Sequence, residues 1–507
     1  MAQKKTPGVY IVEKNAFPNS VIEVPTAVPA FIGYTEKANN RGKSLLNKLT
    51  RITSLGEYMQ FYGGAPKYQY LLTEEKQEGL VSDFIIKDKT YYLKSSGGKH
   101  NLFNSIRLFF QNGGGPCYIN SVGTYSDAID IESLMGKGIP PLVKEDEPTM
   151  VIIPEAIHLK NDDCIALQKA VLKHCGKMQN RVAILDIYDG YKERKDPSGD
   201  VIDNFRNSIG IDSLSYGAAY YPWLNTTIVG DSELGILNLT NESLVVLQSL
   251  MMKELNLPQA AGENESVKTT ELRALLARIP NINNEDGPSV DELKKALLNI
   301  SPTFNNILID IKNQLNLLAP SAAMAGVFTV VDNNRGVWKA PANISLNSVS
   351  SPAVQISHDE QEDLNITLSG KSINAIRSFI GEGVLVWGAR TLDGNSNDWR
   401  YINVRRTMIM LEQSLKFAAK AYVFKSNNAH TWASMKTMIE NFFHNKWKEG
   451  ALVGSSPEEA YSVNIGLGST MTPEDILEGI LRISVLVAVS RPAEFIEITF
   501  QQQMQKS

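Results

Sequence analysis

The order of apolar and polar positions divides the chain into segments that favour different structures. Short continuous apolar runs at residues 27–34, 150–153 and 182–187 are typical of strands buried on both faces. Apolar residues at helical spacing over 162–173 separate two of these runs. Buried strands that alternate with helices predict a parallel sheet covered on both sides, so an α/β fold is expected in the middle of the chain.

The last third of the chain has a different rhythm. Apolar stripes predict two long helices over residues 408–422 and 432–447. A short helix over 473–481 is expected between two strands at 461–466 and 483–489. This mixture of helices and short strands predicts a second domain of the α+β type.

Both ends of the chain have strand character but too few residues for a core of their own. Residues 9–12 follow a Pro-Gly pair, and residues 495–500 alternate in polarity after Pro492. An isolated strand leaves its backbone unpaired, so these ends are either frayed termini or arms that complete the sheet of another molecule. The candidate arm residues are Val9, Tyr10, Ile11, Val12, Phe495, Ile496, Glu497, Ile498, Thr499 and Phe500.

These patterns predict a chain of four parts. Two surface insertions are expected in the core, because residues 65–100 are polar and tyrosine-rich and residues 231–315 change to helices and polar loops. The parts are an extended N-terminal β arm (1–25), an α/β core with its insertions (26–345), an α+β C-terminal domain (346–490) and an extended C-terminal β arm (491–507).

Composition narrows the class of protein. The 507 residues carry a net charge of −5, with 43% hydrophobic and 21% charged residues, which is ordinary for a soluble globular protein. A mildly acidic chain has no electrostatic footprint for nucleic acid, and no apolar run approaches the ~20 residues that span a bilayer. The start lacks the apolar stretch of a secretory signal, and three cysteines fit a reducing compartment. We therefore expect assembly in the cytoplasm, without nucleic acid or direct membrane insertion.

One short motif resembles part of a nucleotide-binding site. Gly42-Lys43-Ser44 matches the end of a phosphate-binding loop, whose backbone amides wrap the phosphate. That loop requires a further glycine at the position where Lys37 stands, so a polar turn is the better interpretation and no cofactor is expected.

A second group of residues has the side chains of a zinc site. His158, Cys164, His174 and Cys175 lie within one stretch, but eleven residues of predicted helix separate the cysteines by roughly 16 Å. A tetrahedral ion needs its ligands about 2 Å away. Packed thiols and surface histidines are the preferred interpretation, and no metal site is expected.

Asp186 and Asp189 are the strongest catalytic candidates, because they follow a buried strand where α/β enzymes place their chemistry. No histidine or activated-serine motif accompanies them, and turn formation explains the Asp-Gly pair equally well. An α/β enzyme of hydrolase type stays an alternative, with no catalytic residue assigned.

Several blocks, in order along nearly the whole chain, resemble contractile tail sheath proteins. The group formed by residues 373–377, 383–392 and 399–406 is the most specific, whereas the two expected insertions match no strong motif. The main matching blocks are residues 6–13 (TPGVYIVE), 26–33 (TAVPAFIG), 112–122 (NGGGPCYINSV), 338–343 (WKAPAN), 383–392 (GVLVWGARTL), 399–406 (WRYINVRR) and 491–496 (RPAEFI).

The resemblance implies a structural protein rather than an enzyme. Members of this family have a subtilisin-like α/β core without protease function, a C-terminal domain that faces an inner tube, and terminal arms that join sheets of neighbouring subunits. The implied partners are other copies of the chain, the inner tube protein, baseplate and terminal cap proteins, and sister sheath proteins. A phage tail, a tailocin and an extracellular injection particle all stay open.

By the same resemblance, one helix of the C-terminal domain contacts the tube. The expected helix at 473–481 is the candidate, with Glu474, Asp475 and Glu478 as its acidic face. A solvated face explains these residues equally well, because Asp and Glu favour helix N-termini.

Overall fold

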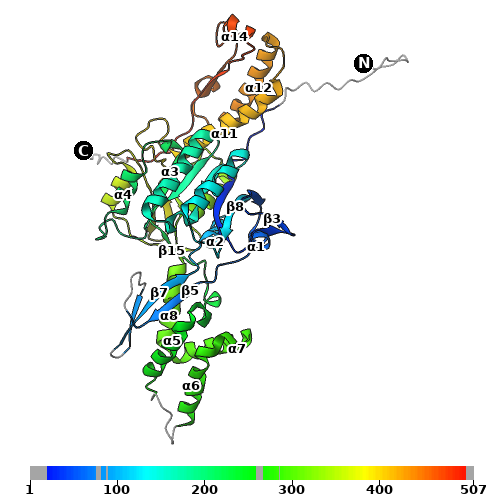
Figure 1. The fold of residues 1–507 in the computed structure, drawn as a ribbon. Helices are drawn as coiled ribbons and strands as arrows, with labels where there is room; N and C mark the ends of the chain where they lie inside the picture. Colours follow the sequence, from blue (N-terminus) through cyan, green and yellow to red (C-terminus); the bar gives the residue numbers. More distant parts are fainter. Residues whose placement is uncertain (1–19, 76–81, 87–88, 258–265, 285, 498–507) are drawn as a thin grey trace, which may run out of the picture. The chain divides into compact units, whose positions relative to one another are not determined.

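The computed structural model describes residues 20–75, 82–86, 89–257, 266–284 and 286–497, and the chain forms two compact units (Figure 1). We refer to the larger as the core unit, which comprises Ala27–Asn334 and Pro341–Ile402. The smaller, the C-terminal unit, comprises the described residues of Met1–Thr26, Arg335–Ala340 and Asn403–Ser507.

A nine-stranded mixed sheet forms the centre of the core unit. Its middle strands, from β16 to β8, pair in parallel, and antiparallel strands complete both sides. The predicted buried strands are therefore confirmed, within a mixed sheet. In order across the sheet, the strands are β14 (Ile344–Ser345), β17 (Gly383–Trp387), β16 (Asn374–Phe379), β11 (Gly217–Tyr221), β10 (Val182–Asp186), β9 (Met150–Ile152), β1 (Pro29–Thr35), β8 (Cys117–Thr124) and β4 (Thr50–Ile52).

Successive residues of a strand point to opposite faces of the sheet. Both faces of this sheet are apolar, and helices pack on each of them. Ala30 and Ile32 of β1 belong to one buried cluster with residues of α3 (Asn161–Met178). Between them, the ring of Phe31 lies 5.2 Å from that of Phe109 on α2 (Leu102–Gln111). Further helices of the core unit are α1 (Leu55–Tyr62), α4 (Val201–Ser208), α9 (Ser321–Arg335) and α10 (His358–Asn365).

The predicted apolar stripe of α3 is partly wrong. Within the predicted helical stretch 162–173, Ala166 and Lys169 are exposed. The buried side instead carries Leu167 and Gln168, whose amide donates a hydrogen bond of 2.7 Å to the carbonyl of Asp186. At this core position the amide nitrogen of a polar residue bonds a backbone carbonyl, which a hydrophobicity pattern does not register.

The two predicted insertions share one hydrophobic cluster, and we call them together the lobe (residues 65–97 and 229–315). A small sheet from the first insertion and helices from the second contribute to it. The elements of the lobe are β5 (Gln69–Thr73), β6 (Ser82–Ile86), β7 (Lys89–Gly97), α5 (Asn241–Glu254), α6 (Val267–Ala277), α7 (Gly287–Ile300) and α8 (Pro302–Leu315).

Two long helices and a pair of strands make up the C-terminal unit. The helices are α11 (Ile402–Ala419) and α12 (Ala429–Lys448), and the strands are β18 (Tyr461–Asn464) and β19 (Ser484–Val487). Their apolar side chains form one buried cluster, as the two predicted stripes required. The remaining α-helices and strands of the described residues are β2 (Asn39–Asn40), β3 (Lys43–Ser44), β12 (Leu224–Thr226), β13 (Leu317–Leu318), β15 (Val349–Pro352), α13 (Pro457–Ala460) and α14 (Pro473–Leu477).

The chain divides at a different place from the predicted boundary after residue 345. Pro341–Ile402 belongs to the core unit, because β14, β16 and β17 pair within the nine-stranded sheet. The C-terminal unit in turn includes Arg335–Ala340. The sequence prediction failed here because the sheet that a strand joins depends on the strands it pairs with, and these lie far away in the sequence.

Candidate functional site

Asp186, the first catalytic candidate, has a structural role in the core unit. It is buried at the end of β10 and accepts hydrogen bonds from the backbone amide of Ser321 (2.8 Å) and from the Ser321 hydroxyl (2.5 Å). These bonds satisfy the first residue of α9, whose N-terminus also favours a negative charge. Burial nonetheless raises the pKa of Asp186 to about 6. The carboxyl group is thus occupied as a helix cap.

Asp189, the second candidate, lines a pocket of about 190 Å³ together with Lys192 and Ser198. The Lys192 ammonium lies 2.7 Å from the Asp189 carboxylate and 3.2 Å from the Ser198 hydroxyl. Sequence reasoning missed this serine–lysine contact, which in principle could activate a nucleophile. The hydrogen bond with Asp189 raises the pKa of Lys192, so the lysine stays protonated and cannot serve as the base.

The cysteine and histidine candidates do not form a metal site. Cys164 and Cys175 are buried on α3, and among the described residues no cluster of ligand side chains suits a metal ion. His174 was expected at the surface, but it is only 8% exposed. Its place on the buried side of α3 corrects that prediction.

The Gly42-Lys43-Ser44 pattern lies in a tight turn. Lys43 and Ser44 form β3, which pairs with β2 immediately before the turn, and Gly42 has a φ of 85°. Both β3 residues are exposed. This geometry is a short hairpin rather than a strand-to-helix phosphate loop.

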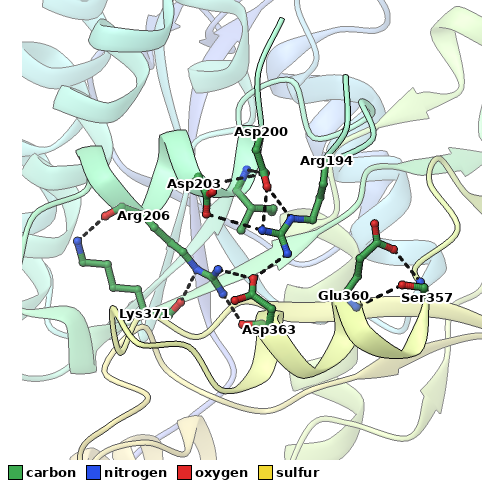
Figure 2. A network of polar contacts seen from close by, with 9 residues as sticks. Arg194, Asp200, Asp203, Arg206, Ser357, Glu360, Asp363 and Lys371 are labelled. Carbon is green, nitrogen blue, oxygen red and sulfur yellow. Dashed lines mark hydrogen bonds and ion pairs between the residues drawn. The ribbon is translucent and has the colours of Figure 1, made fainter. Parts of the chain in front are cut away.

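A network of charged side chains joins α4 to α10 within the core unit (Figure 2). The Arg194 guanidinium lies between Asp200 and Asp363, at 2.8 and 2.7 Å. Arg206, only 4% exposed at its side chain, reaches the same Asp363 oxygen at 2.7 Å. Although burial alone would raise it, these two guanidinium groups hold the pKa of Asp363 below its usual value.

The network is completed by backbone bonds. Arg206 donates to the carbonyls of Asp363 (2.6 Å) and Lys371 (3.1 Å), and the Lys371 ammonium donates to the carbonyl of Arg206. Asp200 also caps α4 through the amide of Ile202, at 2.8 Å. Every group in Figure 2 therefore has partners within the chain, and the network holds α4 and α10 together rather than offering a binding site. The Asp200 cap was the one signal in the sequence that could have indicated it.

The C-terminal unit offers a site of another kind. Its strands β18 and β19, which we call the ribbon, pair with each other in register from Tyr461 opposite Val487 to Asn464 opposite Ser484. Within the described residues no third strand joins either outer edge. One face of the ribbon packs on the unit, where Val463 is 3% exposed, whereas Leu486 is 65% exposed. Unpaired edges of this kind can accept strands from another chain.

The candidate acidic helix lies on the loop between the two ribbon strands. It is shorter than predicted, because α14 ends at Leu477 rather than at residue 481. Glu474 and Glu478 are exposed, but Asp475 is not a free acidic group. Its carboxylate accepts from Thr472 (3.0 Å) as part of a capping box and pairs with Arg482 at 2.9 Å.

The structure places only part of the candidate arms. Phe495 and Ile496 are 70% and 79% exposed, and Glu497 beside them pairs with no strand of the described residues. The other arm residues, Val9, Tyr10, Ile11, Val12, Ile498, Thr499 and Phe500, lie outside the described residues. The strand predicted at the C-terminal end is therefore absent from its described part, and pairing with another chain stays a prediction.

Comparison with known proteins supports a single family. Residues 395–503 match the phage tail sheath C-terminal domain. The tail sheath protein of Enterobacteria phage T4 is 27% identical over 146 residues, and that of Vibrio phage KVP40 is 24% identical over 214 residues. These alignments cover 27% and 40% of this chain but only 22% and 30% of the relatives. The chain thus matches less than a third of the length of these two proteins.

Solved structures match over the full length. The contracted PVC sheath complex of an extracellular contractile injection system is 25% identical, with a TM-score of 0.60 over 99% of both chains. The contracted helical sheath of the anti-feeding prophage is 27% identical, with a TM-score of 0.61 over 99% of this chain and 100% of the other. Among the described residues, no helix is long and apolar enough to cross a membrane. The C-terminal domain match, the curated relatives and the full-length structural matches thus agree that the chain is similar to contractile tail sheath proteins.

Proposed function

We propose that the chain is a structural subunit that polymerises around an inner tube and contracts to drive this tube through a target envelope. The observation that carries the proposal is the ribbon, a two-stranded sheet without a third strand in the described residues, in a chain whose ends have strand character. An isolated two-stranded sheet is marginally stable in water; the ribbon is supported by the unit on which it packs, and further strands would add to that support.

In this proposal the two arms are the added strands. Residues 9–12 of one neighbour and 495–500 of another pair with the outer edges of the ribbon, so that backbone hydrogen bonds give affinity and side-chain pockets give register. Such contacts join different surfaces of identical subunits, and they build open helical polymers rather than closed dimers.

Contraction then needs no nucleotide. Two packings of rigid subunits differ in the surface that they bury, and the difference in interface free energy performs the work while the arms keep subunits joined. Both solved sheaths described above are in a contracted state, which supports a second packing for this chain. We assign no catalytic role, because Asp186 and Asp189 are occupied by Ser321 and Lys192.

Several finer features belong to the same proposal. The core unit is taken to be a subtilisin-like α/β core that has no protease function. The polymer is expected to contact an inner tube protein, a baseplate and a terminal cap, with sister sheath proteins as further partners. Assembly takes place in the cytoplasm, and the finished particle is released from the cell.

Deletion of either arm tests the proposal. We expect that removing residues 1–20 or 493–507 abolishes sheath polymers when the chain is expressed with its inner tube protein, while the monomer stays soluble and folded. Negative-stain microscopy detects polymers as hollow striated tubes, and circular dichroism detects the folded monomer. Normal sheaths from either truncated chain would overturn the arm mechanism, and misfolded monomers would show that the ends pair within their own subunit.

A point substitution provides a matched control. Ile498→Asp places a charge in the expected cross-subunit sheet, which costs several kcal/mol when the charge is unpaired. Ile498→Val keeps an apolar β-branched residue at the same position and should assemble normally. Equal assembly of the two variants would exclude residue 498 from a buried interface.

A further inference from the structure

The segment that leads from the N-terminal end to the core unit lies on the C-terminal unit. We call residues 21–26 the strap. The backbone amide of Val24 donates a hydrogen bond of 3.1 Å to the Ser414 hydroxyl on α11, and the Arg406 guanidinium donates one of 3.0 Å to the carbonyl of Thr26. The side chains of Val21 and Val24 pack against the hydrophobic cluster of this unit. Two apolar side chains and two backbone bonds thus hold the strap.

A buried lysine adds a charged contact to the strap. Lys446 on α12 is 5% exposed, and its ammonium contacts the carboxylates of Glu23 and of Glu449, the latter at 2.6 Å. The same nitrogen lies 5.3 Å from the centre of the Trp338 ring, at cation–π distance. Burial alone would lower the pKa of Lys446, but its bonds with the two carboxylates raise it overall, so the lysine stays charged.

We propose that α11, α12 and Trp338 form a binding site for residues 21–26 of the same chain, which anchors the N-terminal arm to the C-terminal unit. The consequence for assembly rests on the proposed function. With the strap bound, the arm begins at the unit that carries the ribbon, and it follows this unit when the subunit moves.

The anchor limits how far the arm can reach. Nine residue steps separate Val12 from Val21, and a fully extended chain spans at most ~3.3–3.6 Å for each, or roughly 30 Å in all. If the strap is released, the first held residue becomes Val28, whose amide donates to Thr149 at 3.0 Å in the core unit. The arm would then gain about seven residues, or roughly 24 Å, and would lose its fixed starting point.

Hydrogen exchange of the full-length monomer tests the strap directly. In Lys446→Met the Glu23 carboxylate loses its buried partner, and we expect the amide of Val24 to exchange roughly 10- to 100-fold faster, the range for a lost charged hydrogen bond. Lys448→Met is the matched control, because Lys448 is exposed and lies two residues further along α12. In this variant the amide of Val24 should exchange at the wild-type rate. Unchanged exchange in Lys446→Met would overturn the proposal.

A second variant covers the risk that Lys446→Met disturbs the unit. Glu23→Gln removes the charge from the strap side, where the Glu23 side chain is 39% exposed, and leaves Lys446 paired with Glu449. It should also speed the exchange of Val24, with an unchanged circular dichroism spectrum. Wild-type exchange at Val24 in this variant would likewise overturn the proposal.

Co-expression with the inner tube protein tests the consequence for assembly. Folded Lys446→Met should give fewer and less regular striated tubes than Lys448→Met, and tubes equal in yield and regularity would overturn that consequence. Absence of tubes from the wild type would instead contradict the proposed function, while the exchange data on the monomer would still decide whether the strap is bound.

Discussion

The nine-stranded sheet of the core unit and the ribbon of the C-terminal unit differ in how far the chain completes them. Every residue of β1 and β10 is buried, and each of these strands has a neighbour on both sides. In the ribbon, β19 alternates between exposed and half-buried residues, and each strand has one partner in the described residues. The difference separates what a monomer needs for folding from what it offers to a partner.

The core unit also contains a buried cation whose hydrogen bonds are made within the unit. Arg181 is fully buried, and its guanidinium donates to Asn180 and to the carbonyls of Leu142 and Glu145. The ribbon has no comparable group, and packing of its one face supports it, including the ring of Tyr461 at 5.7 Å from that of Phe443. Substitutions in the core should therefore change monomer stability, whereas substitutions on the ribbon's outer face should change assembly.

The largest expected effect on the monomer is a pH dependence that Glu155 causes. This side chain is fully buried, and burial raises its pKa from 4.5 to about 8, although the backbone amide of Leu102 donates to it at 2.9 Å. The native state retains the proton more strongly than the unfolded state, so stability is complete below pH ~4.5 and falls as the pH rises to about 8. A rise of roughly 3.5 units at about 1.36 kcal/mol each gives a loss on the order of 5 kcal/mol.

Glu155→Gln should remove most of this pH dependence. Glutamine keeps a carbonyl oxygen for the amide of Leu102 and cannot ionise. Denaturant unfolding of both proteins at pH 5 and pH 8 measures the change, with the exposed Glu132→Gln as control. Substitution of the neighbouring Gly33 cannot test the same point. A Cβ at Gly33 would lie 2.2 Å from the Glu155 carboxylate and would clash with it. Parallel pH profiles for Glu155→Gln and the wild type would show that Glu155 titrates normally.

Arg181→Met should have the next largest effect. It leaves the carbonyls of Leu142 and Glu145 without a donor in the core, and a hydrogen bond to a charged group contributes about 1.5–3 kcal/mol. Removal of a buried charge offsets part of this loss, so we expect a decrease of about 2–3 kcal/mol in the free energy of unfolding. Lys177→Met, at an exposed position of α3, should change it by less than about 0.5 kcal/mol. Equal unfolding midpoints for the two variants would contradict this prediction.

The sequence predicted the core sheet better than the site. Continuous apolar runs located β1, β9 and β10 because burial on both faces leaves a local signature. The domain boundary was missed because pairing of β16 with β11 depends on residues more than 150 positions apart. Arg194, Arg206 and Asp363 were not singled out for the same reason, since only the fold brings them together. At the ribbon, the sequence identified strand character but could not show which edges stay open.

A charge on the outer face of the ribbon should separate folding from assembly. Leu486 is 65% exposed, so Leu486→Asp should change the free energy of unfolding by no more than about 0.5 kcal/mol. If added strands and neighbouring subunits bury this face in the polymer, the same charge is desolvated there and tubes should be lost. Val463→Asp is the converse control, because Val463 is 3% exposed and a charge there should destabilise the monomer itself. Normal tubes from Leu486→Asp would show that this face stays exposed in the sheath.

The smallest expected effect on the monomer comes from the loop between the ribbon strands. Glu474 and Glu478 are exposed, whereas Asp475 caps α14 and pairs with Arg482, so charge reversal at the first two leaves the cap intact. We expect Glu474→Lys with Glu478→Lys to melt like the wild type. If these carboxylates face basic groups of the inner tube, the double variant should bind the tube about tenfold more weakly, since two exposed attractive contacts become repulsive. Salt should reduce the difference, because exposed charges are screened at high ionic strength. Sedimentation of sheath with tube at low and high salt measures both, and Asp475→Lys is the contrasting variant, which should lower the melting temperature by removing the cap. Equal tube binding by the double variant and the wild type at low salt would remove this helix as the tube contact and leave it as a solvated turn at the end of the ribbon.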